Sequence, residues 1–157
     1  EDRAELVRKQ GLEPIAATAA SRWFTDPFLQ SHPSVVSHLC NDLSAGSALG
    51  YANCCEALAK ADLRDELKQI TIPVLIIAGT LDPVTTVTDA EWMLQHIPKA
   101  QLVEINASHI SNIEQPEAFN QAVQKFIAAS FPVVVSFFAF KQTTFYSHLY
   151  LRGFQEE

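Results

Sequence analysis

The stretch PVLIIAGTLDPVT, residues 73–85, decides the fold that we predict for this chain. It begins as a continuous apolar run of strand length between a proline and a glycine, which is typical of a strand buried on both faces in a parallel sheet. A polar loop carrying Asp82 follows, and a helix is then expected from Thr85 to His96. The apolar face predicted for this helix, with spacing i, i+3, i+4, i+7, contains Ala90, Met93, Leu94 and Ile97.

The same order of elements then repeats. The partial alternation of QLVEINA, residues 101–107, predicts a second, more exposed strand, and the loop ASHISN after it carries His109. A helix is expected over residues 117–129, with Pro116 at its start. Strand–helix–strand–helix predicts two neighbouring parallel strands joined by a right-handed crossover, so the fold class is α/β.

The first 60 residues contain no strand pattern and are predicted to be entirely helical. Prolines and glycines mark the expected ends of the helices. The expected elements are a short helix containing Leu6 and Val7 that ends at Gly11, a helix from Pro14 with Ile15, Ala16, Ala19 and Trp23 on one face, a turn at Asp26-Pro27, a helix from Pro33 with Val35, Val36, Leu39, Cys40 and Leu43 as its apolar side, and a helix from Tyr51 to Lys60.

Residues 131–157 differ in composition from the rest of the chain. They hold six of the ten phenylalanines and two of the three tyrosines. Aromatic and β-branched residues favour an added strand or hairpin, and a non-native extension is the alternative. The apolar run is too short to span a bilayer.

Composition and charge exclude several function classes. The chain is 48% hydrophobic and 18% charged, as expected for a folded protein, and its net charge of −7 argues against a nucleic-acid partner. The spacing of Cys40, Cys54 and Cys55 matches neither a disulfide framework nor a zinc site. We therefore expect the three cysteines to be small buried apolar residues of a protein in a reducing compartment. No signal peptide or membrane-spanning run is present, and a cytoplasmic location without a membrane partner is expected.

Asp82 and His109 are the candidate catalytic residues. Loops beyond the carboxyl ends of parallel strands collect functional groups, and adjacent strands lie about 4.8 Å apart, so the two side chains can meet. Asp82 would accept the Nδ1–H of His109 and fix its tautomer, which leaves Nε2 to act as general base and then acid. Taken singly, an aspartate here is usually a turn former and a loop histidine usually polar surface. The acid-then-histidine order after consecutive strands favours the catalytic interpretation.

Four segments carry a more specific resemblance. RWFTDPF, GYANCCEALAKADLR, PVLIIAGTLDPVT and ASHISNIEQPEAFNQAV, in this order, resemble the C-terminal half of the 3-oxoadipate enol-lactonases, which are α/β-hydrolases. The resemblance runs from near Arg3 to about Ala128. It implies a helical cap region over residues 1–60, the C-terminal part of a hydrolase core over residues 61–130, and a tail of unknown origin over residues 131–157.

The resemblance also implies an activity. It is the hydrolysis of 3-oxoadipate enol-lactone, a small-molecule substrate, to 3-oxoadipate in the β-ketoadipate pathway of aromatic catabolism, without a metal or organic cofactor. Asp82 and His109 match the family's acid and base. Trp23 and Arg22 become candidate substrate-pocket residues, with Arg22 as the cationic partner of the substrate carboxylate. Packing within the cap is the alternative for both.

The sequence departs from this family in one respect. The nucleophile elbow G-x-S-x-G is absent, and the strings around Ser44 and Ser47 lack its spacing and lie in the helical part. The elbow and the oxyanion loop normally precede the cap, so we expect the nucleophile outside this chain. The strand over residues 74–78 would then present an unpaired edge, which a second polypeptide, a dimer contact or the aromatic tail must cover.

Two other functions stay open at this stage. Asp82 and His109 also suit an ester, thioester or C–C hydrolase of the same fold, and only the cap segments and SHISNIEQP favour the lactonase. A non-catalytic remnant is the third possibility. It would lose nothing but stability when His109 is replaced by alanine.

Overall fold

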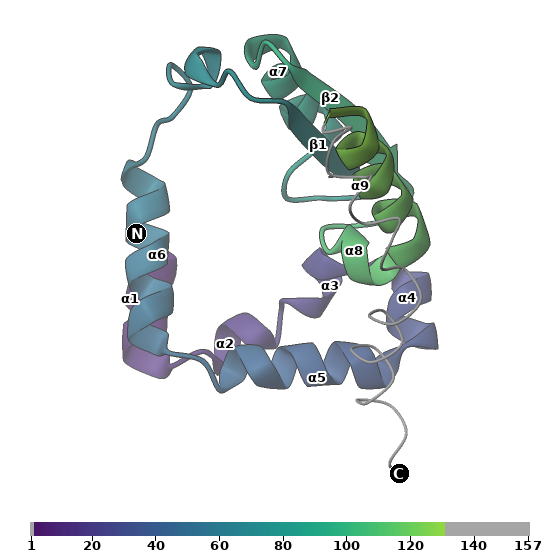
Figure 1. Ribbon diagram of the computed structural model, residues 1–157. Coiled ribbons are helices and arrows are strands. Elements are labelled where there is room, and N and C mark those ends of the chain that lie inside the picture. Colours follow the sequence, from purple (N-terminus) through teal and green to yellow (C-terminus); the bar gives the residue numbers. More distant parts are fainter. Residues whose placement is uncertain (1, 131–157) are drawn as a thin grey trace, which may run out of the picture. The chain divides into compact units, whose positions relative to one another are not determined.

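The computed structural model describes residues 2–130, so the strand or hairpin considered for the aromatic-rich tail lies outside the described residues. The elements of Figure 1 are α1 Asp2–Gln10, α2 Glu13–Ala16, α3 Ala20–Trp23, α4 Asp26–Ser31, α5 Pro33–Ser44, α6 Ala48–Lys60, the 3-10 helix η1 Leu67–Gln69, β1 Val74–Gly79, α7 Val87–His96, β2 Ala100–Ile105, α8 Ser111–Glu114 and α9 Pro116–Ser130. The chain divides into two compact units, Glu1–Phe119 and Asn120–Glu157. The predicted division into cap, core and tail stays a prediction.

The two strands are parallel neighbours, which confirms the predicted α/β arrangement. Their register runs from Val74 opposite Ala100 to Gly79 opposite Ile105. Both strands therefore end at the same edge of the sheet, and the loops carrying Asp82 and His109 leave it side by side. This register is the structural reason that the two predicted site residues can meet.

The core around the sheet gathers on one face of β1. Ile76 and Ala78 are buried together with Ala90 of α7 and with Ile97, the residue after α7. The prediction that β1 is buried on both faces is wrong in one respect, because Leu75 and Ile77 are only half-buried. Successive strand residues point to opposite faces, and α7 covers the face of Ile76 and Ala78.

The predicted apolar face of α7 is also wrong at one position. Met93 is 37% exposed, whereas Ala90 is buried and Leu94 half-buried. The helix begins at Val87, and Val87 and Leu94 pack against the core on the same stripe as Ala90. Met93 lies at the border of that stripe and is left facing solvent.

The helices of the first 60 residues differ from the prediction in two places. The single helix expected from Pro14 is two short helices, α2 and α3, separated by a turn over residues 17–19. The turn expected at Asp26-Pro27 is instead the start of α4. Thr25 before it is extended, with φ −72° and ψ 155°, and the fixed φ of proline suits the first turn of a helix.

The other helical predictions agree better with the structure. α1 ends before Gly11, whose φ of +76° is a conformation that favours glycine. α5 begins at Pro33 as expected. α6 begins three residues before Tyr51, because the Ser47 side chain accepts a hydrogen bond from the Gly50 N–H and caps the helix there. α1 and α6 pack beside each other (Figure 1), and Arg8 Nη1 lies 2.5 Å from Glu56 Oε1 between them.

The expectation of buried cysteines is wrong. Cys54 is exposed, Cys40 and Cys55 are only half-buried, and all three are free thiols. The buried residue of α6 is Ala52; Cys54, two positions later, points away from that side of the helix, whereas Cys55, three positions later, borders it. No helix within residues 2–130 is long and apolar enough to cross a membrane.

Gly79 allows the two loops to approach each other closely. A β-carbon at this position would lie 2.4 Å from the Ser108 carbonyl oxygen and 2.6 Å from that of Ala107. Both obstacles are backbone atoms of the loop that carries His109, and backbone cannot rotate aside as a flexible side chain would. A glycine at the end of β1 is therefore a condition for the observed distance between the loops.

We expect Gly79→Ala to destabilise the chain by about 1–3 kcal/mol, because an added methyl group must push the His109 loop away from the sheet. Gly50→Ala is the matched control, since its β-carbon would meet only Ser47 side-chain atoms at 3.4 Å, an ordinary contact. In that helix alanine should raise stability by up to about 1 kcal/mol. Urea unfolding followed by circular dichroism measures both. Equal urea midpoints for Gly79→Ala and the unmodified chain would contradict a tight approach of the His109 loop to Gly79.

Candidate active site

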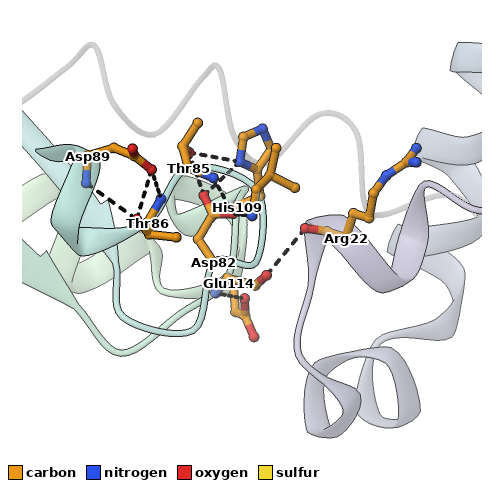
Figure 2. A network of polar contacts seen from close by, with 9 residues as sticks. Arg22, Asp82, Thr85, Thr86, Asp89, His109 and Glu114 are labelled. Atoms are coloured by element: carbon orange, nitrogen blue, oxygen red, sulfur yellow. Dashed lines mark hydrogen bonds and ion pairs between the residues drawn. The ribbon is translucent and has the colours of Figure 1, made fainter. Parts of the chain in front are cut away.

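Asp82 is held by a dense set of hydrogen bonds just beyond β1. Its Oδ1 accepts from the backbone N–H of Val84 at 2.7 Å and of Thr85 at 3.1 Å. Its Oδ2 accepts from the Thr85 hydroxyl at 2.7 Å and lies 2.7 Å from Nδ1 of His109 (Figure 2). The Asp82 side chain is only 4% exposed. The turn thus fixes both carboxylate oxygens even without the contact to His109.

These contacts set the protonation of the pair. Burial raises the pKa of Asp82, but hydrogen bonds from His109, Val84 and Thr85 outweigh it, and the net pKa lies below the ordinary value. The carboxylate is therefore ionised at neutral pH and can only accept hydrogen bonds. Nδ1 of His109 must carry the proton in this contact, and Nε2 of a neutral ring is left with its lone pair.

His109 is accessible on the side that Asp82 does not occupy. Its side chain is 36% exposed, nine times the exposed fraction of its partner carboxylate. Within residues 2–130, its ring hydrogen bonds are made by Nδ1, the second being a 3.4 Å contact to the Thr85 hydroxyl. A buried acid that orients a partly exposed imidazole can support proton transfer to and from a group placed at Nε2.

The backbone around His109 is fixed by its neighbours in sequence. Ala107 and Ser108 are buried, and the Ala107 carbonyl accepts from the N–H of Leu81 at 3.0 Å. The Ser108 N–H donates to Glu114 Oε2 at 2.7 Å, and the Ile110 N–H donates to the Trp23 carbonyl at 3.0 Å. The exposed imidazole is therefore carried by a loop whose main chain is bonded on both sides of it.

The structure joins the backbone carbonyls of Arg22 and Trp23 to this loop by hydrogen bonds. The Ser108 hydroxyl donates to the Arg22 carbonyl at 3.4 Å, and the Arg22 side chain extends away from Asp82 and His109 in Figure 2. Both residues are half-buried. Their predicted roles in a substrate pocket stay predictions, as do the catalytic roles of Asp82 and His109.

The two serines whose strings lack the spacing of a nucleophile elbow have other places in the structure. Ser44 is the last residue of α5, and the Ser47 hydroxyl is the acceptor that caps α6. In the part of the chain that the structure describes, no group of three or more His, Cys, Asp and Glu side chains is placed to hold a metal ion.

Sequence reasoning missed several residues that support the site. Thr85 follows Asp82 by three positions and donates its hydroxyl to the carboxylate, beside the Val84 N–H that closes an Asx-type turn. Thr86 and Asp89 form a reciprocal capping box at the start of α7, and its T-x-x-D pattern could have been found. Glu114 lies in the four-residue helix α8, which is too short to produce a periodic signal.

Known proteins that resemble this chain are α/β-hydrolases. The family model described as TAP-like protein, an α/β-hydrolase model, matches residues 43–131. The chain is 59% identical over 122 residues to 3-oxoadipate enol-lactonase 2 and 50% identical over 125 residues to 3-oxoadipate enol-lactonase 1, both of Acinetobacter baylyi. These matches cover 78% and 80% of this chain, and 46% and 47% of the two relatives.

A solved structure agrees with these matches. The crystal structure of the enol-lactonase from Burkholderia xenovorans LB400 superposes with a TM-score of 0.78 and 37% sequence identity, over 81% of this chain and 49% of that chain. The chain thus spans about half the length of the curated relatives that it matches.

The lowered pKa of Asp82 predicts a pH-dependent contribution to stability. Because its folded pKa lies below the unfolded value of about 3.9, the ionised carboxylate stabilises the fold above that pH, and this stabilisation is lost as pH falls through the folded pKa. At pH 7, Asp82→Asn should cost about 1–3 kcal/mol, because an amide cannot accept at both oxygen positions. The difference from the unmodified chain should shrink below about pH 4.

Chemical denaturation between pH 3 and 7 measures this difference, with Asp65→Asn as the control that removes an exposed carboxylate. A constant deficit for Asp82→Asn across the whole range would contradict a lowered pKa for Asp82.

Three observations agree on the identity of the fold. The parallel strands end at one edge, an aspartate and a histidine meet there in acid-then-histidine order, and the family model covers more than half of the chain. The chain belongs to the α/β-hydrolase family.

Proposed function

We propose that this chain supplies the acid and the base of a Ser-His-Asp hydrolase that opens 3-oxoadipate enol-lactone to 3-oxoadipate. The observation that carries the proposal is the 2.7 Å contact between Nδ1 of His109 and Oδ2 of Asp82, with the acid buried and the base partly exposed. The 59% identity to 3-oxoadipate enol-lactonase 2 of Acinetobacter baylyi supports the choice of substrate.

In the proposed mechanism, Nε2 of His109 removes the proton of a serine that lies outside this chain. The serine oxygen attacks the lactone carbonyl, and backbone N–H groups stabilise the resulting oxyanion. Ring opening releases an enolate, which takes up the proton that His109 removed from the serine and becomes the ketone, so the imidazole returns to its neutral form. His109 then activates a water that hydrolyses the acyl-enzyme, while Asp82 stabilises the imidazolium formed in each step. No step calls for a metal or an organic cofactor.

The substrate-facing part of the proposal concerns Arg22 and Trp23. The lactone carries a carboxylate, and a guanidinium is a suitable partner for it. The carbonyls of both residues accept hydrogen bonds from the loop of His109, which supports their proximity to the site. In the observed arrangement Arg22 would have to swing its side chain to reach a substrate at Nε2 (Figure 2). Residues 1–60 would then act as the cap over this site.

The sheet supports a further part of the proposal. Within residues 2–130, β1 pairs only with β2, so one edge of an apolar strand has no strand beside it. Proteins normally cover such edges. We propose that other strands of the complete hydrolase, in the same polypeptide, a second chain or a dimer partner, cover it. Three free cysteines suit a reducing compartment, which favours a cytoplasmic location.

A chimera tests this function directly. The chain replaces the 122-residue matching region of the Acinetobacter baylyi enol-lactonase 2, so that the relative supplies the remaining half. We expect the chimera to hydrolyse 3-oxoadipate enol-lactone. His109→Ala should lower kcat/KM by at least about 10³-fold, because it removes the base. Asp82→Asn should lower kcat by up to about 10⁴-fold, because His109 then takes up the wrong tautomer.

His38→Ala is the matched control, because this histidine is 77% exposed and its ion-pair partner, Asp42, lies on its own helix. It should leave the kinetics unchanged. A chimera that folds but hydrolyses only other esters or thioesters would contradict the lactone as substrate. Full activity of the His109→Ala chimera would contradict the catalytic role and favour the non-catalytic alternative.

A further inference from the structure

Glu114 is a buried carboxylate that the proposed mechanism does not use. It is 8% exposed, at the end of α8. Oε2 accepts from the Ser108 N–H at 2.7 Å, and Oε1 accepts from the Thr25 N–H at 3.2 Å and from the Thr25 hydroxyl. The structure gives it no ion-pair partner among residues 2–130. A buried carboxylate without a cation is tolerated only where donors surround it, so these contacts hold Glu114 in place.

The two oxygens of Glu114 join segments that are far apart in the sequence. Ser108 is six residues from Glu114 and directly precedes His109, whereas Thr25 is 89 residues away. Further hydrogen bonds join the same segments on both sides of His109. They run from the Ser108 hydroxyl to the Arg22 carbonyl at 3.4 Å and from the Ile110 N–H to the Trp23 carbonyl at 3.0 Å.

Among the side chains of residues 2–130 that join these segments, that of Glu114 is the one that accepts from both of them, one at each carboxylate oxygen. An amide in its place would have one oxygen and one NH₂, and the NH₂ would face a backbone N–H on one side. One of the two segments would then be left with an unpaired buried donor and would move or take up water. The carboxylate therefore does what a neutral isostere of the same size cannot do.

We propose that Glu114 is a positioning residue that fixes the His109 loop and the segment Arg22–Thr25 at one separation, so that the base and the substrate-facing residues are set as one unit. This inference rests on the proposed function for its kinetic consequence, whereas its structural consequence can be measured without it. Glu114 acts through the Ser108 N–H on the ring orientation of His109, and through Thr25 on the segment that carries Trp23.

The structural consequence is measured in the 157-residue chain with ¹⁵N-labelled histidine. The readout is the NMR resonance of the proton between Nδ1 of His109 and Oδ2 of Asp82. Glu114→Gln should shift this resonance or broaden it until it is lost. Glu117→Gln, which changes an exposed glutamate, should leave it in place. Thr25→Val removes only the hydroxyl contact and should produce a smaller shift of the His109 resonance. Thr25→Ser keeps a hydroxyl and should leave the resonance at its original position.

The kinetic consequence is measured in the chimera. Glu114→Gln should lower kcat roughly 10- to 100-fold, because a displacement on the order of 1 Å at reacting groups costs about 10²-fold. KM should rise as well if the segment Arg22–Thr25 contacts substrate. Combining Glu114→Gln with Thr25→Val should cost less than the sum of the two, because both act on one contact.

The outcomes separate this inference from the proposed function. An unmodified chimera without lactonase activity would count against the function, and the His109 resonance would still decide the role of Glu114. A Glu114→Gln chain that melts earlier but keeps the His109 resonance, together with an unchanged kcat and KM, would reduce Glu114 to a stabilising residue and overturn the inference.

Discussion

The contact between Nδ1 of His109 and Oδ2 of Asp82 is the constraint on which the rest of the site depends. It exists because β1 and β2 run parallel in a register that ends at Gly79 and Ile105. Parallel strands bring two loops that are distant in sequence to the same end of the sheet. A slip of one residue in the register would turn the side chains of the displaced strand to the opposite face of the sheet. Gly79 makes this approach possible, since its missing side chain leaves room for the carbonyls of Ala107 and Ser108.

The site combines a rigid acid with an accessible base. Asp82 is ionised because donors from its own turn and from His109 outweigh its burial, and the same donors fix its direction. The imidazole has one nitrogen bound to this fixed group and the other side toward solvent. Glu114 extends this rigidity to the main chain, because it holds the residue before His109 to the segment that follows Trp23. Asp82, His109 and the segment Arg22–Thr25 are thus linked by one set of hydrogen bonds.

The sequence predicted the sheet and the meeting of Asp82 with His109, because both follow from one rule about parallel strands. It did not predict the break between α2 and α3, since the alanine-rich run around Ala19 favours a continuous helix by propensity. In the structure the two helices are separated by a turn in which the N–H groups of Thr18 and Ala19 donate to the carbonyls three residues before them. The role of Glu114 was also hidden, because its partner Thr25 lies 89 residues away and only the folded chain brings them together.

The most direct test of the account is the rate at which a fluorophosphonate labels the serine of the chimera. Such a reagent needs an activated serine hydroxyl but does not need a substrate pocket for the lactone, so a difference between variants at Asp82 or His109 reports on the activation of the serine. We predict rapid labelling of the unmodified chimera, and labelling slowed by at least about 10²-fold when His109 is replaced by alanine or Asp82 by asparagine. Equal labelling rates in all three proteins would contradict the claim that Asp82 and His109 form the acid–base pair.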